Sequence, residues 1–175
     1  MNGLTGLSAF FTAHALPRPA ETIGCTALHF EAGGKGHNQA VACARLGAAC
    51  VFVGAVGRDA QAEQCRTVMN KEGVQPLLVD KEEPTAFAAI TTAADGENIV
   101  QVYPGAAAQL LPEDLLEQNI RVTLESCDVL LMQNELGREC LDTALWLAEK
   151  VGIRMVWYGC QKHILVECSI THCTI

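Results

Sequence analysis

The amino-acid sequence predicts an α/β fold in which helices flank a parallel β-sheet and a hairpin projects from it. From residue 35 onward, short runs rich in β-branched residues alternate with longer helical repeats. This alternation is typical of βαβ units, in which each helix returns the chain to a parallel neighbouring strand. An Asp95-Gly96 pair between two β-rich runs interrupts the alternation and predicts the hairpin.

The first helix is expected directly after two adjacent glycines. Gly33 and Gly34 allow backbone N–H groups to approach a ligand that a Cβ atom would keep away. An alanine-rich stretch follows, and Gly47 lies where a left-handed residue would end a helix. Residues 50–53 are apolar and predict the next buried strand. This segment therefore predicts a glycine loop, a helix and a strand.

The next two elements continue the alternation. Residues 59–71 have helical composition and stop before Gly73, and residues 74–79 predict a strand. Because Pro76 lacks the N–H group that a central strand donates, this strand is expected at an edge of the sheet.

The rest of the chain holds the hairpin and a second α/β segment. Pro112 suits the first turn of a helix, and Gly152 suits the end of a later one. The expected elements are hairpin strands at residues 87–92 and 99–103, a helix from Pro112 through Ile120, a strand at 127–133, a helix ended by Gly152 and a strand at 153–157.

Composition and charge exclude several classes of partner. The formal net charge is −8 with twelve Lys and Arg residues, so we expect no nucleic-acid or membrane partner. No stretch approaches the roughly 20 apolar residues of a transmembrane helix. The apolar residues before Ala13-His14-Ala15 lack the basic segment of a signal peptide. Nine cysteines, an odd number without C-x-x-C spacing, are expected to be reduced, as in a cytoplasmic protein.

The run GGKGHNQA at residues 33–40 closely resembles the sugar-binding loop of the ribokinase family, the PfkB-type carbohydrate kinases. Further segments are similar to family motifs in the same order, namely LPRPAETI at 16–23, PTAFAAI at 84–90, VYPGA at 102–106 and LLMQNE at 130–135. A tight strand-to-helix turn without a ligand is the competing interpretation of the glycines. A phosphate-binding P-loop is excluded because the GxxxxGK[ST] pattern is absent.

The resemblance covers residues 15–157 and implies a ribokinase-like parallel sheet, flanked by helices, with a small β-sheet lid. Residues 1–157 would form the N-terminal part of such a domain, with lid strands at approximately 10–33 and 84–104. Residues 158–175 do not match the family and are expected to be a divergent tail, so the predicted fold is truncated.

The resemblance also assigns a sugar site. The loop would surround the hydroxyls of a pentose, with ribose as the expected sugar, and a carboxylate beyond a strand would accept hydrogen bonds from them. The assigned residues are Gly33, Gly34, Lys35, Gly36, Asn38 and Glu135. Ligands of open α/β sheets bind at such strand ends. Without the resemblance, Glu135 also suits a carboxylate favoured by a helix N-terminus. His37 is expected to face the loop without a role in binding.

At two places this chain lacks polar residues that the family uses around the sugar, so the expected set of sugar-binding groups is incomplete. The family has an Asn and an Asp at the end of its N-terminal strand, and these positions fall near Gly6 and Ser8 in this chain. A serine hydroxyl forms hydrogen bonds but supplies no carboxylate. Ala107 stands where the family usually has an Asn.

The family uses ATP, Mg²⁺ and a monovalent cation, and a GxGD aspartate deprotonates the attacking hydroxyl. No GxGD occurs in these 175 residues, so we assign no catalytic residue and no cofactor or metal site. The last eighteen residues hold cysteines and histidines whose spacing matches no common zinc pattern, at Cys160, His163, Cys168, His172 and Cys173.

Three functions are compatible with these observations. The favoured one is a ribokinase-type chain, belonging to an enzyme that phosphorylates D-ribose to ribose 5-phosphate with ATP but inactive on its own. The second is a noncatalytic module that binds sugar or forms a homodimer through the lid strands. The third is a poorly folded, silent product. Adenosine, fructose phosphate and nucleoside kinases share parts of the loop, so their substrates remain alternatives.

Overall fold

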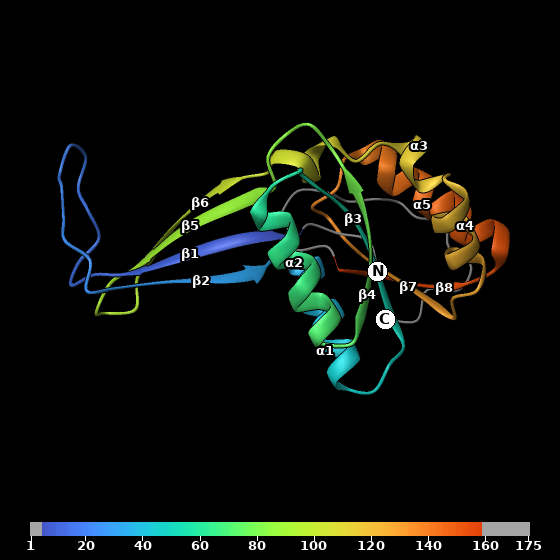
Figure 1. Ribbon diagram of the computed structural model, residues 1–175, viewed down its shortest axis with the longest axis horizontal. Helices are drawn as coiled ribbons and strands as arrows, with labels where there is room; N and C mark the ends of the chain where they lie inside the picture. Colours follow the sequence, from blue (N-terminus) through green and yellow to red (C-terminus); the bar gives the residue numbers. More distant parts are fainter. Residues whose placement is uncertain (1–4, 159–175) are drawn as a thin grey trace.

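The computed structural model describes residues 5–158, so all but the first residue of the expected tail at 158–175 lies outside the described residues. An α/β body and a long, narrow sheet that projects from it make up this part of the chain (Figure 1). The body contains β3 (Cys50–Val56), α2 (Ala60–Lys71), β4 (Val74–Asp80), α3 (Pro112–Leu115), α4 (Gln118–Glu125), β7 (Val129–Gln133), α5 (Arg138–Val151), β8 (Arg154–Tyr158), the helix α1 (Lys35–Arg45) and a 3-10 helix, η1 (Gly105–Gln109).

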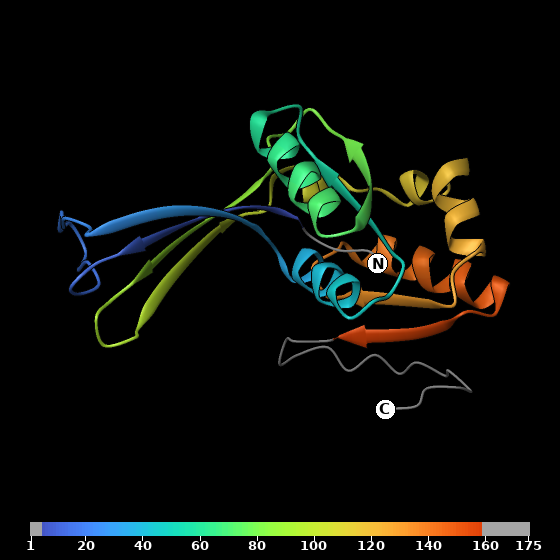
Figure 2. The same cartoon turned by 60° about the horizontal axis from the view of Figure 1, so that its bottom comes forward.

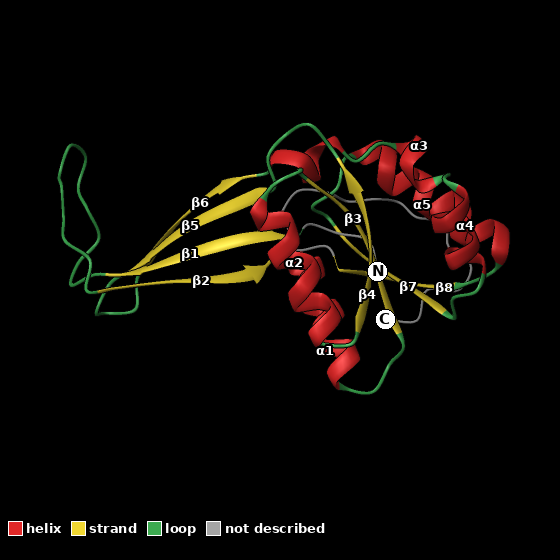
Figure 3. Cartoon of the chain, viewed as in Figure 1, coloured by secondary structure: helices red, strands yellow, loops and turns green. Residues whose placement is uncertain are grey.

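The projecting sheet, called the lid below, has four strands. They are β1 (Gly6–Thr12), β2 (Ala27–Gly33), β5 (Ala86–Thr92) and β6 (Asn98–Tyr103), in the order β2-β1-β5-β6 (Figure 3). The two central strands, β1 and β5, leave the body side by side and parallel, whereas β2 and β6 return antiparallel to them. β1 starts at Gly6, earlier than the resemblance suggests, and contains the apolar residues near the N-terminus.

The body strands form two parallel pairs, β3 with β4 and β7 with β8. β4 pairs only with β3 in this part of the chain, which agrees with the edge position expected from Pro76. The predicted class, a parallel α/β fold with a β-sheet lid, is confirmed.

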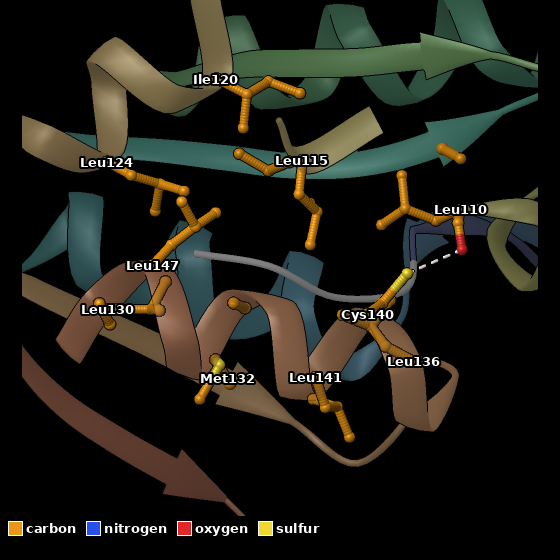
Figure 4. Packing of buried hydrophobic residues seen from close by; sticks show 14 residues of the cluster. Leu110, Leu115, Ile120, Leu124, Leu130, Met132, Leu136, Cys140, Leu141 and Leu147 are labelled. Carbon is orange, nitrogen blue, oxygen red and sulfur yellow. Dashed lines mark hydrogen bonds between the residues drawn. The ribbon is translucent and has the colours of Figure 1, made fainter. Parts of the chain in front are cut away.

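Helices cover both faces of the body strands (Figures 1 and 2). Successive strand residues point to opposite faces, so Phe52 packs with α1 and α2 while Val53 and Ala55 pack with α3, α4 and α5. The smaller cluster consists of Ala40, Phe52, Met69 and Val74. The larger one, drawn in Figure 4, contains Leu110, Leu115, Ile120, Leu124, Leu130, Met132, Leu136, Cys140, Leu141, Ala144, Leu147 and Ala148 beside Val53 and Ala55.

A buried thiol at the start of α5 forms a hydrogen bond within the larger cluster. The Sγ atom of Cys140 donates to the carbonyl oxygen of Leu110 at 2.9 Å (Figure 4). Burial raises the pKa of Cys140 to about 11, so the thiol stays neutral and keeps the proton that it donates. The carbonyl oxygen of Leu110 thereby has a hydrogen-bond donor from α5.

The prediction of one helix from Pro112 through Ile120 is wrong, because the structure has two short helices there. Leu116 ends α3, and Glu117 adopts an extended conformation with φ −57° and ψ 141° before α4 begins. In one continuous helix, Leu115 and Ile120 would lie about 140° apart and could not both face the core. The break at Glu117 lets both side chains be buried.

Turn glycines fall where the sequence predicts them. Gly47, Gly73 and Gly152 have positive φ angles directly after α1, α2 and α5, and Gly96 has one in the hairpin between β5 and β6. Between residues 5 and 158, no helix has the combination of length and apolar character that crossing a membrane requires.

Candidate functional site

The glycine loop connects the lid directly to the first helix of the body. β2 ends at the buried Gly33, Gly34 follows with φ 109° and ψ 149°, and α1 begins at Lys35. A side chain at Gly34 would be strained at this φ, which explains the glycine. The backbone N–H of Asn38 donates to the carbonyl oxygen of Gly34 at 2.9 Å and closes the first turn. The loop is therefore a short, rigid corner.

An ion pair joins this corner to the carboxyl end of β7. Lys35 Nζ lies 3.0 Å from Glu135 Oε1, although the two residues are a hundred positions apart in the sequence. The Lys35 side chain is 45% exposed and that of Glu135 is 20% exposed. Glu135 Oε2 is buried and makes no hydrogen bond within residues 5–158. The pair therefore places an ammonium donor beside a buried carboxylate oxygen that has no partner among the described residues.

Two further polar groups flank Gly33. A Cβ atom built on Gly33 would lie 3.6 Å from Ser8 Oγ on β1 and 3.9 Å from Asn38 Oδ1 on α1. The missing side chain thus leaves a space between a hydroxyl and a carboxamide. The resemblance places the family's Asp near Ser8, where this chain has a neutral hydroxyl instead.

Sequence reasoning missed a glutamine pair beneath the ion pair. Gln133 at the end of β7 is completely buried, and its Nε2 atom donates to Gln39 Oε1 on α1. Its own Oε1 atom has no partner in the described part of the chain. Gln39 lies in the GGKGHNQA run and Gln133 in the LLMQNE segment, so both residues belong to segments that carry the family resemblance. Two interactions therefore join α1 to the end of β7: the ion pair of Lys35 with Glu135 and the hydrogen bond of Gln133 to Gln39.

The expectation that His37 faces the loop is wrong. Its side chain is only 2% exposed, and Nδ1 lies 3.1 Å from the hydroxyl of Thr5, just before β1. Burial lowers the pKa of His37, and the nearby charge of Glu72 opposes this only in part. His37 therefore joins α1 to the chain that enters the lid.

The other residues singled out in the sequence differ in how far they are buried. Gly36 is buried in the first turn of α1, whereas Asn38 is exposed beside Gly33. Gly6 packs its backbone against Ala86, and Ala107 is buried in η1. The structure thus pairs Lys35 with Glu135 and places Ser8 and Asn38 next to Gly33, and these neutral and charged groups suit a polyhydroxylated ligand.

Comparison with known proteins identifies the family of this chain. The family described as pfkB family carbohydrate kinase matches residues 7–164. The chain belongs to this family. A ribokinase from Haemophilus influenzae is 30% identical over 152 residues, covering 86% of this chain and 49% of the relative. A ribokinase from Bacillus subtilis is 30% identical over 176 residues, covering 98% of this chain and 58% of the relative.

A solved structure shows the same relation. The ribokinase from Cryptococcus neoformans, crystallised with ADP, superposes with a TM-score of 0.77 at 31% identity. The match covers 93% of this chain and 49% of that chain. This chain therefore spans about half the length of the relatives it matches.

Proposed function

We propose that this chain carries the sugar-binding part of a ribokinase-type kinase and binds a pentose, D-ribose, between the glycine loop and Glu135. The observation that carries the proposal is the ion pair between Lys35 and Glu135 beside Gly33. It lies beyond the carboxyl end of a parallel strand, where open α/β sheets bind ligands. The ribokinase names of several relatives support ribose as the sugar.

The groups at the site match the hydrogen-bonding needs of a sugar. Each buried hydroxyl must both donate and accept. Glu135 Oε2 is a buried acceptor without a partner among the described residues, Lys35 is a donor, and the carboxamide of Asn38 offers both. The hydroxyl of Ser8 also does both but carries no charge. We therefore expect Ser8 to bind two adjacent sugar hydroxyls more weakly than an aspartate at this position would.

We further propose that residues 1–175 do not transfer phosphate by themselves. The family reaction needs a nucleotide, metal ions and a base placed around the transferred group. The sequence contains no GxGD motif, and no three His, Cys, Asp or Glu side chains between residues 5 and 158 are grouped so as to hold a metal ion. We therefore assign no ATP, Mg²⁺ or monovalent-cation ligand to this chain.

Two measurements on the purified protein test this function. Isothermal titration with D-ribose should show binding, and a coupled assay for ADP release should show no turnover above background. Binding without turnover supports the proposal. ATP-dependent turnover would overturn the inactivity, and absence of ribose binding would overturn the sugar site.

The loop itself is tested by replacing Asn38 with Ala. Leaving sugar hydroxyls unpaired should weaken D-ribose binding by about 1 to 3 kcal/mol. The matched control is Asn70→Ala on the exposed face of α2, which should bind as the wild type does. An unchanged affinity in Asn38→Ala would show that the glycine loop is structural in this chain.

A second candidate function is assembly of a homodimer through the lid. Every residue of β6 is exposed, and large apolar side chains lie on the lid, including Phe30 at 51% and Val102 at 59% exposure. A second copy of the lid would cover such apolar strands. Sedimentation of the wild type against a Val100→Asp, Val102→Asp variant tests this, because only the wild type should dimerise.

All six cysteines of the described residues are free, which supports a cytoplasmic setting.

A further inference from the structure

The root of the lid is the place where β1 and β5 leave the body. In the lid register, Gly33 of β2, Gly6 of β1 and Ala86 of β5 lie opposite one another in a single row. Backbone hydrogen bonds hold neighbouring strands about 4.8 Å apart. The position of Ala86 therefore determines where Gly33, and with it the glycine loop, lies.

Thr85, the residue before β5, is tied to the body by three hydrogen bonds. Its hydroxyl donates to Asp59 Oδ1 at 2.6 Å, and its backbone N–H donates to Asp59 Oδ2 at 2.7 Å. The same hydroxyl accepts from the backbone N–H of Gly57 at 2.9 Å. Thr85 is only 3% exposed, so water does not compete well for these bonds.

Asp59 fixes the other side of this network. It is the N-cap residue of α2, where Oδ1 accepts from the backbone N–H of Ala62 at 2.9 Å. Burial disfavours its charge, but the hydrogen bonds from Thr85 and Ala62 outweigh this and lower the pKa of Asp59. Within residues 5–158 no ion pair involves Asp59, so N–H and O–H donors alone balance its carboxylate.

Three glycines enclose the segment that carries Thr85. A Cβ on Gly57 would lie 2.6 Å from the carbonyl oxygen of Glu83 and 2.7 Å from the amide nitrogen of Thr85. A Cβ on Gly6 would collide with the carbonyl oxygen of Ala86, and one on Gly105 with that of Pro84. Residues 83–86 are therefore held between close backbones and cannot shift independently.

We propose that Asp59 and Thr85 are positioning residues for the sugar site, which fix the first residue of β5 and, through the row of Ala86, Gly6 and Gly33, set the glycine loop opposite Glu135. That the loop so placed binds a pentose rests on the proposed function. The placement itself depends only on the hydrogen bonds and the register.

Hydrogen–deuterium exchange of the ligand-free protein tests the placement. Thr85→Val keeps the shape of the side chain but removes its hydroxyl, so exchange of the amides at residues 33–38 should become roughly tenfold faster. Thr85→Ser keeps the hydroxyl and should restore the wild-type rate. Thr91→Val, six residues further out on β5, is the matched control and should change nothing at residues 33–38.

Titration with D-ribose adds a functional measurement. Thr85→Val should raise the Kd roughly tenfold, and Thr85→Ser should bind within about twofold of the wild type. Asp59→Asn provides a second variant if Thr85→Val fails to fold. Asn still caps a helix well, but its NH₂ group cannot accept from Thr85. It should therefore reproduce the faster exchange at residues 33–38.

The outcomes separate this inference from the proposed function. Wild-type exchange at residues 33–38 in both Thr85→Val and Asp59→Asn would overturn the positioning role, whether or not residues 83–86 exchange faster. A wild-type protein that binds no D-ribose would overturn the proposed function, and the exchange measurement would still decide the role of Asp59 and Thr85.

Discussion

The body and the lid of this protein are stabilised in opposite ways. The body encloses a cluster of fourteen buried residues between β3, β7 and three helices. In the lid, all of β6 and most of β2 are exposed, and apolar side chains such as Phe30 and Val100 face outward. The lid therefore has no core of its own, and its order comes from strand pairing and from the way its root is held.

This difference identifies where each region is sensitive to change. In the body, stability depends on side-chain volume, because close-packed interiors respond to the loss of single methylene groups. At the lid root, it depends on backbone approach, because Gly6, Gly57 and Gly105 bring main-chain atoms too close for a Cβ. Along the lid strands, single side chains should matter little for stability.

The largest effect is expected in the body. Leu115→Ala removes a side chain that is 1% exposed and should lower the free energy of unfolding by about 2 to 5 kcal/mol. Leu28→Ala, at an exposed position on β2, should change it by less than about 0.5 kcal/mol. Urea denaturation of both variants measures the contrast. Equal losses would mean that the lid contributes a core of its own.

A smaller effect is expected at the lid root. Gly6→Ala places a Cβ against the backbone of Ala86, so β1 or β5 must move, at a cost of about 1 to 3 kcal/mol in stability. Gly24→Ala is the control, because nothing lies within 4 Å of its added Cβ. If both variants unfold at the wild-type urea concentration, the close approach at the root carries no energetic weight.

Acid should loosen the contact between the body and the strand that enters the lid. His37 is buried neutral with a lowered pKa, whereas in the unfolded chain it takes up a proton near pH 6.5. Stability is therefore unaffected above that pH and falls as the pH drops below it towards the folded pKa. We expect Tm to fall by roughly 2 to 4 °C at pH 5.5 relative to pH 7.5.

One variant tests the contribution of His37. His37→Gln should flatten the dependence of Tm on pH below 6.5. A wild-type slope in His37→Gln would contradict the role of burial.

The smallest effect is expected at the ion pair of the site. Lys35→Met removes a half-exposed partner of Glu135 and should change the free energy of unfolding by less than about 0.5 kcal/mol. Arg138→Met, which breaks the exposed pair with Asp142 on α5, serves as a comparison. A loss above about 1 kcal/mol for Lys35→Met alone would show that the pair stabilises the fold rather than being kept for ligand binding.

Local features of the sequence determined most of the elements. The glycines at 47, 73, 96 and 152 marked three helix ends and a hairpin, because only glycine adopts positive φ without strain. Pro76 marked an edge strand, and the glycine motif marked both the loop and the family. Each of these signals acts within a few residues, so it could be recognised without knowing the fold.

Tertiary packing alone decided how the site is assembled. The pairing of Lys35 with Glu135, of Gln39 with Gln133 and of Asp59 with Thr85 joins residues that are far apart in the sequence. Packing also buried His37 and broke the helix at Glu117 so that Leu115 and Ile120 could both reach the core. The physical reason is that burial and hydrogen-bond partners depend on which elements meet, and local propensity carries no information about that choice.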